Sequence, residues 1–194
     1  MELAIDSACI PQQDDLGKVR DLVAAMHRGV PRAELGDVVG LSSRHVRYTL
    51  HAARALGLTV QDGKAWNITP TVADLLGVEA ASDSEKQVLR RLVSDSPALM
   101  AVVPELFTDS SLELETLGER LMEKAGFSGS TAMRRAMTLL AWRDALQPVE
   151  VKIAAPVMPQ PVIEEEEEEI EELVMVPEPG YERDFDSEGQ ILMF

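Results

Sequence analysis

The sequence predicts a mainly α-helical body with one small β-hairpin, followed by an acidic C-terminal tail. Three observations support this prediction. Residues 42–56 have the spacing of a capped amphipathic helix, and residues 58–68 have the alternation and the turn of a hairpin. At Pro148 the composition changes abruptly to Pro and Glu, which cannot bury enough apolar surface to fold.

The helix predicted over residues 42–56 has two chemically different faces. Ser42 or Ser43 can cap its first turn, and Gly57 can end it. At roughly 100° per residue, the face that can enter a core comprises Val46, Leu50, Ala53 and Leu56. The opposite face comprises Arg44, Arg47, Tyr48, His51 and Arg54. One buried face and one basic face are typical of the recognition helix of a helix-turn-helix unit.

The elements around this helix predict a winged-helix domain over residues 16–79. A first helix over 16–28 and a short second helix over 31–39 precede the two-faced helix. After it, two short runs of alternating polarity flank Asp62 and Gly63, which form a strong hairpin signal. Three helices followed by a hairpin are the element order of a winged helix. The residues before this domain, 1–15, are predicted to form a short N-terminal arm.

Residues 80–147 are predicted to form a second helical domain. Capping residues, prolines and glycines divide it into four helices, over about 82–94, 97–107, 112–126 and 131–146. A short helix, a turn and a longer capped helix with arginines repeat the plan of the first domain, which suggests tandem helix-turn-helix units. In the last helix one face comprises Arg134, Arg135, Thr138 and Trp142, and the other comprises Met133, Ala136, Met137 and Leu140. We expect Trp142 to pack between helices, whereas the two arginines can form a second DNA surface.

The net charge of −16 is distributed unevenly along the chain. Residues 1–147 carry 16 Lys and Arg against 20 Asp and Glu, whereas residues 148–194 carry 2 against 14. Within residues 18–64 the balance reverses to 8 against 4. Because most of the excess acid lies beyond residue 147, the charge of the whole chain does not argue against a basic surface that binds nucleic acid.

The predicted DNA contacts are basic or polar side chains at the recognition helix and around it, since Arg and Lys reach phosphates and guanine edges. They are Arg44, Arg47, Tyr48, His51 and Arg54 on the helix, Lys64 on the wing, Arg28 and Arg32 near the second helix, and Arg134 and Arg135 in the second domain. Two other interpretations remain open: an ordinary solvated helix face, and a winged helix that binds protein.

Residues 148–194 are expected to form a disordered acidic tail with one of three roles. The tail can keep the protein in solution, compete with DNA for the basic face, or dock a protein partner. The residues expected to dock such a partner are Phe185, Ile191, Leu192, Met193 and Phe194. This end loosely resembles the tip of bacterial single-strand DNA-binding proteins, although Gly189 and Gln190 depart from that pattern.

Residues 41–76 resemble the winged-helix modules of type II restriction enzymes and other phage-defence proteins. The matching residues are Arg47, Tyr48, Ala52, Ala53, Leu56, Gly57, Leu58, Ile68 and Thr69. Ala73 stands where that pattern often has glycine, and residues 129–146 also resemble a segment of those modules. The resemblance covers about residues 16–147. It implies DNA binding or attachment to a defence effector, and it implies no chemistry.

We therefore expect a non-enzymatic protein that reads duplex DNA, as a regulator or as the DNA-targeting subunit of a defence system. The alternative is a winged-helix interaction subunit of a larger complex, such as an SMC-like or a defence machine. Either protein can act as a homodimer, and a protein partner can bind the tail.

Catalysis, cofactors and a membrane span are not expected. Glu150 and Lys152 have the spacing of half a restriction-nuclease site, but no predicted sheet holds them beside a second acid. The three histidines and the single cysteine lack the spacing of metal ligands. No signal-peptide pattern, no long apolar run and one cysteine together indicate a reduced, cytoplasmic setting.

Overall fold

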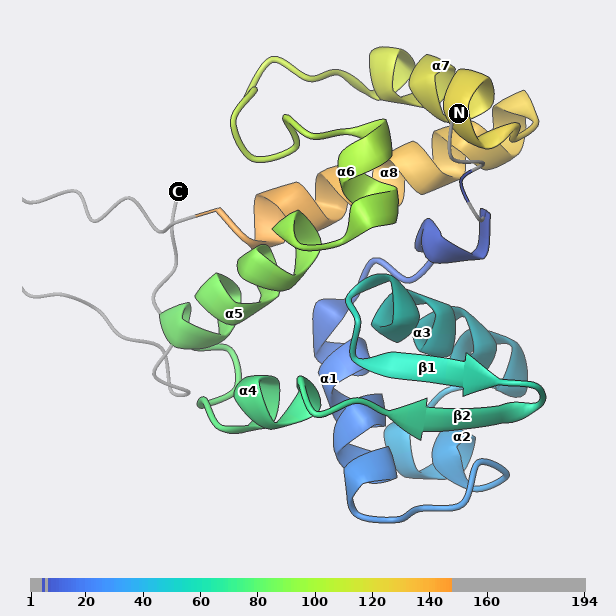
Figure 1. The fold of residues 1–194 in the computed structure, drawn as a ribbon, viewed down its shortest axis with the longest axis vertical. Coiled ribbons are helices and arrows are strands. Elements are labelled where there is room, and N and C mark those ends of the chain that lie inside the picture. The colour runs from blue at the N-terminus through green and yellow to red at the C-terminus, as the bar shows by residue number, and fades with distance from the viewer. Residues whose placement is uncertain (1–4, 6, 148–194) are drawn as a thin grey trace, which may run out of the picture. The chain divides into compact units, whose positions relative to one another are not determined.

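The computed structural model describes residue 5 and residues 7–147 (Figure 1). This part of the chain is mainly helical with one two-stranded antiparallel hairpin. The prediction of a mainly α-helical body with a small hairpin is therefore confirmed. None of its helices is long and apolar enough to cross a membrane. The predictions for residues 148–194, including the partner-docking residues and the pair Glu150 and Lys152, lie outside the described residues.

The first half of the body consists of three helices, a hairpin and a short fourth helix. Their bounds are α1 Leu16–His27, α2 Leu35–Val39, α3 Ser43–Ala55, β1 Thr59–Asp62, β2 Ala65–Ile68 and α4 Val72–Leu76. The Asp15 side chain caps α1 by accepting a hydrogen bond from the Lys18 amide at 3.1 Å. The Ser42 side chain caps α3 in the same way, from the His45 amide at 3.4 Å.

Two glycines make sharp turns in this half of the body, one between α2 and α3 and one at the tip of the hairpin. Gly40, with φ of 67°, ends α2 in the left-handed conformation that glycine adopts most easily. Gly63, with φ of 57°, lies at the hairpin tip, where the strand register pairs Asp62 with Ala65. The predicted hairpin turn at Asp62 and Gly63 and the predicted glycine turn between the second and third helices are therefore both confirmed.

Four helices form the second half of the body. Their bounds are α5 Asp83–Ser94, α6 Pro97–Val102, α7 Leu114–Ala125 and α8 Gly129–Ala145. The prediction that one helix extends over residues 97–107 is wrong, because α6 ends at Val102 and the next residues form turns. α7 packs along α8 (Figure 1), and the fit is close at Gly118: an added Cβ would lie 2.5 Å from the Met133 sulfur.

The two faces predicted for α8 are partly wrong. The buried residues of this helix are Ala132, Ala136, Thr138, Leu139 and Trp142. Thr138 and Trp142 are therefore buried beside Ala136, which was predicted to lie on the opposite face. Met137, predicted to lie on the apolar face, is 59% exposed. The expectation that Trp142 packs between helices is confirmed, since its side chain is fully buried.

The N-terminal segment explains this arrangement, because it packs into the body between α3 and α8. It includes the short 3-10 helix η1 Ser7–Cys9, and Ile10 is fully buried. Gln13 is 8% exposed and hydrogen-bonded on both sides. Its amide nitrogen donates to Thr49 Oγ1 on α3 at 3.0 Å, and its backbone carbonyl accepts from Trp142 Nε1 at 2.9 Å. The described residues, 5 and 7–147, belong to one compact unit, which therefore contains both predicted helical regions.

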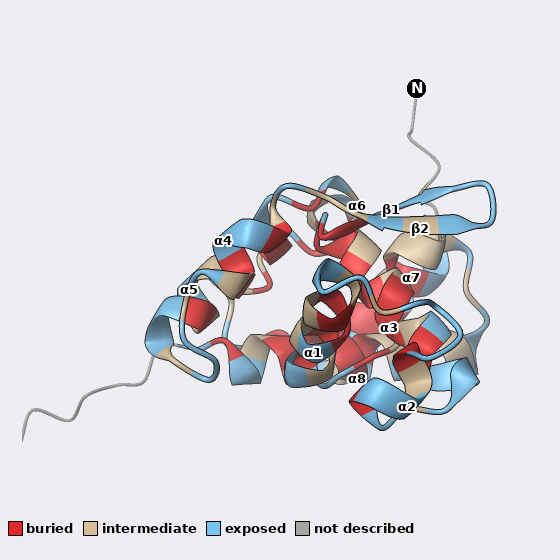
Figure 2. Ribbon diagram, turned by 90° about the horizontal axis from the view of Figure 1, so that it is seen from below, coloured by how far each residue is buried: buried red, intermediate tan, exposed pale blue. Residues whose placement is uncertain are grey.

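The hairpin and α2 contribute mostly exposed surface, whereas α1, α3 and α8 turn buried faces toward the core (Figure 2). In β1 only Thr59 is buried and the other residues are exposed, with Val60 at 49%, whereas β2 alternates between exposed and half-buried residues.

Candidate nucleic-acid interface

The basic face of α3 is exposed over the first half of the helix. Arg44 and Arg47 are exposed, whereas Val46 and Leu50 are buried, as the helical spacing predicts. Towards the C-terminal end of α3, His51 and Arg54 are only half-exposed, because η1 packs against this helix. The accessible part of the face is therefore its first two turns.

Tyr48 is the centre of this exposed surface. Arg44 Nε donates a 2.7 Å hydrogen bond to the phenol oxygen of Tyr48. The guanidinium carbons of Arg44 and Arg47 lie 5.4 and 5.8 Å from the centre of the tyrosine ring, within cation–π range. The hydrogen bond from Arg44 and the positive charges of both arginines lower the pKa of Tyr48 below its ordinary value.

Two arginines from α8 border the same surface. Arg135 is half-buried, and its guanidinium group lies over the Phe127 ring at 5.1 Å. When the Gln12 amide is oriented with its oxygen towards α8, that oxygen accepts hydrogen bonds from Arg135 Nη2 at 2.8 Å and from Nε at 3.2 Å. Burial lowers the pKa of Arg135 to about 10, so the group stays charged at neutral pH. Arg134 is exposed beside it.

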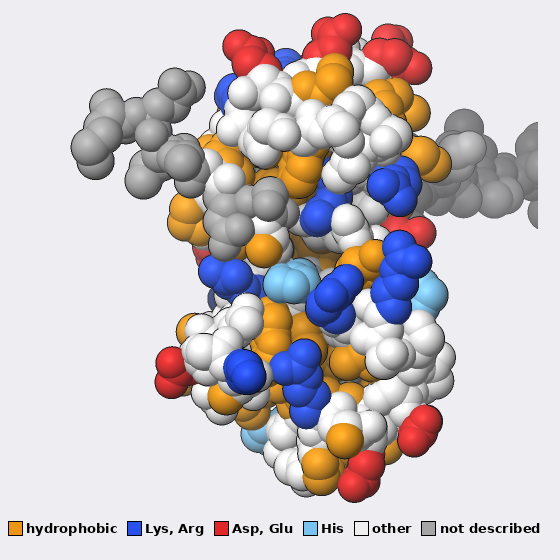
Figure 3. All heavy atoms as spheres, turned by 90° about the vertical axis from the view of Figure 1, so that its right-hand side faces the viewer, with side chains coloured by type: hydrophobic (Ala, Val, Ile, Leu, Met, Phe, Trp, Pro, Cys, Tyr) orange, Lys and Arg blue, Asp and Glu red, His pale blue; other side chains and the backbone are white. Residues whose placement is uncertain are grey.

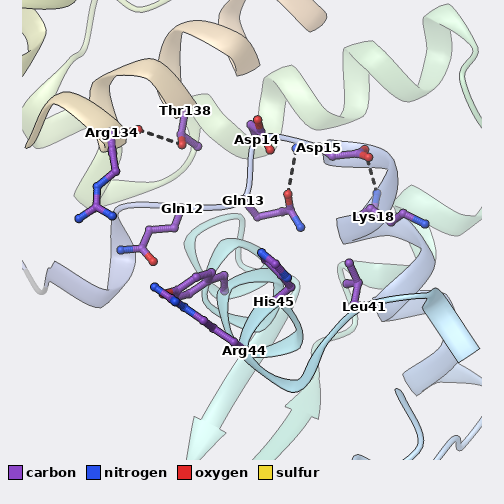
Figure 4. A pocket seen from close by; sticks show the side chains of 11 residues that line it. Gln12, Gln13, Asp14, Asp15, Lys18, Leu41, Arg44, His45, Arg134 and Thr138 are labelled. Carbon is purple, nitrogen blue, oxygen red and sulfur yellow. Dashed lines mark hydrogen bonds between the residues drawn. The ribbon is translucent and has the colours of Figure 1, made fainter. Parts of the chain in front are cut away.

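Two adjoining hollows separate the arginines of α3 from those of α8. One, of about 450 Å³, is lined by Arg44, Tyr48 and Arg134, and the other, of about 350 Å³, by Arg47, Tyr48 and Arg135. Gln12 lines both hollows, and in Figure 4 it lies between Arg134 on α8 and Arg44 on α3. We call the two hollows together the α3–α8 groove.

The four arginines of the groove have no carboxylate partner among the described residues, whereas four other arginines of the body do. Among residues 7–147, no ion pair joins Arg44, Arg47, Arg134 or Arg135 to an acid. Elsewhere in the described residues the arginine ion pairs join Arg20 to Glu85, Arg91 to Asp74, Arg120 to Glu105 and Arg143 to Asp144. Four like charges without an ion-pair partner repel one another, and an anionic ligand would relieve that repulsion.

Acidic side chains also reach the groove at one end. Asp14 and Asp15 line the larger hollow beside Lys18. The Asp15 carboxylate is already engaged with the Lys18 amide at the start of α1. The groove is therefore basic across its middle, where α3 faces α8, and mixed in charge where α1 begins.

The other predicted contact residues lie at three places outside the centre of the groove. His51 lines the smaller hollow and meets the Trp66 ring edge-to-face at 5.2 Å, which links α3 to the hairpin. Arg32 donates a 3.1 Å hydrogen bond to the Lys64 carbonyl at the hairpin tip. Both cations border a hollow of about 500 Å³ with Trp66. Arg28 is exposed directly after α1.

Arg54 does not join Arg44 and Arg47, although it was predicted to share their face. It lines a separate hollow of about 400 Å³ with Cys9 and Pro97. The helical repeat predicts the direction in which a side chain leaves the helix. It does not predict which other segments pack beside that side chain. Here the N-terminal segment and the turn before α6 border the end of α3.

Gln12 and Gln13 belong to the groove but carry no signal in the sequence. They lie in a short stretch between η1 and α1, and their roles depend on contacts with α3 and α8. Only the tertiary structure brings these elements together.

Figure 3 shows the distribution of charge on one face of the molecule. Lys and Arg side chains gather across its middle around a histidine, and Asp and Glu side chains lie mainly at its two ends, with a few at its side edges. Within the described residues, no group of three or more His, Cys, Asp or Glu side chains could hold a metal ion. No family model, curated protein or solved structure matches this chain.

Proposed function

We propose that this chain is a non-enzymatic protein that binds duplex DNA through the α3–α8 groove. One observation carries the proposal: four arginines surround the groove and none of them has an ion-pair partner within the described part of the chain. Phosphate oxygens are the ligands that guanidinium groups bind best, often with two parallel hydrogen bonds.

We also propose that α1, α2, α3 and the hairpin form a winged helix, followed by a second helix-turn-helix-like unit. The order of the elements supports this assignment, with a glycine turn between α2 and α3 and the hairpin directly after α3. The exposed arginines lie in the first two turns of α3, and the N-terminal residues of a recognition helix are those that contact base edges.

The hairpin tip supports the same proposal. Arg32 and Lys64 lie together there, where a wing contacts the DNA backbone. Arg28 is exposed nearby on the chain and is a further candidate for backbone contact. In this scheme the protein is a regulator or the DNA-targeting subunit of a defence system, and its acidic tail restrains binding or docks a partner.

A second function is favoured by the concave shape of the site. Because the N-terminal segment and α8 border α3, the basic residues line a groove and do not stand on a free helix. An acidic peptide of a protein partner could occupy such a groove. Arg clusters bind acidic peptides in this way in other peptide-binding modules. The chain would then be an interaction subunit of a larger complex.

Equilibrium binding of the full-length chain to a fluorescent duplex of mixed sequence tests the proposal. DNA binding predicts saturable binding at low salt, with an affinity that falls linearly on a log–log plot against salt concentration. No binding at low salt, or binding without salt dependence, contradicts the proposal. Recovery of a stoichiometric protein partner from the native cell, combined with no DNA binding, would instead support the interaction subunit.

A further inference from the structure

The two sides of the α3–α8 groove hold their arginines in different ways. Arg44 and Arg47 on α3 are exposed; Arg44 donates a hydrogen bond to Tyr48, and both guanidinium groups lie within cation–π range of its ring. On α8, Arg135 is half-buried between Gln12 and Phe127, and Arg134 Nε is turned back to the Ser130 carbonyl at 3.3 Å. Of the four arginines of the groove, Arg135 alone is half-buried, whereas Arg44, Arg47 and Arg134 are exposed.

We infer that the groove divides DNA recognition between its two sides: α3 contacts bases, whereas Arg134 and Arg135 of α8 bind the sugar–phosphate backbone of one strand. This inference rests on the proposed function. It assigns to α8, and to Gln12 as a positioning residue, a role that is independent of base sequence.

Reach is the first argument for this division. The major groove of B-DNA is about 8.5 Å deep, so a side chain must project freely to touch a base edge. The guanidinium group of Arg135 is fixed against Gln12 and Phe127 and cannot extend in that way. Phosphates lie on the outer surface of the duplex, and a guanidinium held at the rim of a groove can meet them there.

Unused hydrogen-bond capacity is the second argument. A guanidinium group has five N–H donors, and Gln12 takes up two of those on Arg135 when its amide oxygen is oriented towards α8. Arg135 lines the smaller hollow of the groove, and Arg134 precedes it directly on α8. A phosphodiester supplies acceptor oxygens and the missing negative charge together.

Preorganisation is the third argument. Gln12 is followed by Gln13, which is hydrogen-bonded both to Thr49 on α3 and to Trp142 on α8. These buried contacts fix the distance between the arginines of α3 and the arginines of α8 before any ligand binds. A preset separation lowers the entropic cost of binding and suits a ligand with a repeating backbone.

The inference is tested with the full-length chain, a duplex selected from a random library, and a mixed-sequence duplex of the same length. For Arg134→Ala/Arg135→Ala we expect affinity for both duplexes to fall about tenfold, with an unchanged ratio between them. The salt dependence should weaken by about 0.9 in slope for each phosphate that the variant no longer neutralises. For Arg44→Ala/Arg47→Ala we expect the ratio itself to fall at least fivefold, because this variant no longer touches base edges.

Two further variants separate binding from folding. Arg134→Ala alone removes an exposed side chain and should reproduce part of the uniform loss, and Arg135→Lys keeps the charge but not the paired donors. A changed ratio in Arg134→Ala/Arg135→Ala, or unaltered affinity for both duplexes, would overturn the division of roles while DNA binding stands. Failure of the wild-type chain to bind either duplex would overturn both proposals.

Discussion

The indole Nε1 of Trp142 donates a 2.9 Å hydrogen bond to the backbone carbonyl of Gln13, which lies 129 positions earlier in the chain. Both residues are buried, and the Gln13 side chain continues the connection to Thr49 on α3. This chain of contacts joins the helices that carry the arginines of the groove. The site therefore depends on the N-terminal segment, of which Gln12 is the residue that lines both hollows.

Replacing this indole donor should destabilise the protein. Trp142→Phe leaves the Gln13 carbonyl buried without its partner, which costs about 1–3 kcal/mol of unfolding free energy. Trp66→Phe is the matched control, because Trp66 is half-exposed and contacts His51 only through its ring edge. Urea unfolding followed by circular dichroism measures both. Equal effects of the two substitutions would contradict the buried hydrogen bond.

The buried ion pair between Arg20 and Glu85 should matter far more than an exposed one. Arg20 also donates to the carbonyls of Leu75 and Val78, so α1 is joined to the end of α4 and to α5. Glu85→Ala leaves a buried guanidinium without its carboxylate and should cost about 3–5 kcal/mol. Asp74→Ala breaks the exposed pair with Arg91 and should cost at most about 1 kcal/mol.

The same unfolding measurement tests this difference. A cost for Glu85→Ala as small as that for Asp74→Ala would show that Arg20 finds other partners or water.

Gly36 should tolerate no side chain, because α2 and the turn into α3 meet there. An added Cβ would lie 2.6 Å from the Leu41 carbonyl oxygen, which is backbone and cannot move away cheaply. Gly36→Ala should therefore destabilise the protein by about 1–3 kcal/mol. At Gly129, in the first turn of α8, the nearest atom is the Met122 sulfur at 3.7 Å. Gly129→Ala should be neutral or stabilising, and thermal unfolding of both variants checks the contrast.

DNA affinity should fall at alkaline pH through the ionisation of Tyr48. Its pKa is lowered chiefly by the hydrogen bond from Arg44, with a smaller contribution from Arg47, so phenolate forms at a lower pH than in an ordinary tyrosine. As the pH rises through that pKa, a negative charge appears in the groove and repels phosphate. Tyr48→Phe should remove this part of the pH dependence.

Ultraviolet absorbance of tyrosinate follows the ionisation directly in a Tyr181→Phe background, since the chain has two tyrosines. Arg44→Ala should raise the pKa of Tyr48 towards its ordinary value. A titration unchanged by Arg44→Ala would contradict the role of that hydrogen bond.

Local signals in the sequence are sufficient for most of the first half of the fold. Ser42 caps α3 as predicted, and Asp62 and Gly63 turn the hairpin as predicted, because each conformation is decided by neighbouring residues. The separation of Arg44 and Arg47 from Val46 and Leu50 follows from helical geometry alone.

The remaining features depend on contacts between residues far apart in the chain. Trp142, on the buried face of α8, donates its hydrogen bond to the Gln13 carbonyl, and periodicity within α8 cannot reveal that partner. Arg54 likewise has the correct angle on α3 but lies beside Cys9 and Pro97. The groove itself exists only because α8 comes to lie beside α3, so the sequence supplied its arginines but not Gln12.

The most direct test of the DNA-binding groove compares two charge-matched double variants of the full-length chain. Arg44→Ala/Arg47→Ala removes two positive charges from the groove, and Arg91→Ala/Lys124→Ala removes two from exposed positions on α5 and α7. We predict that the first variant binds duplex DNA at least tenfold more weakly, with a salt slope smaller by up to about 2, while the second stays within about twofold of wild type. Equal losses in the two variants, or no loss in the first, would contradict the assignment of the groove as the DNA site.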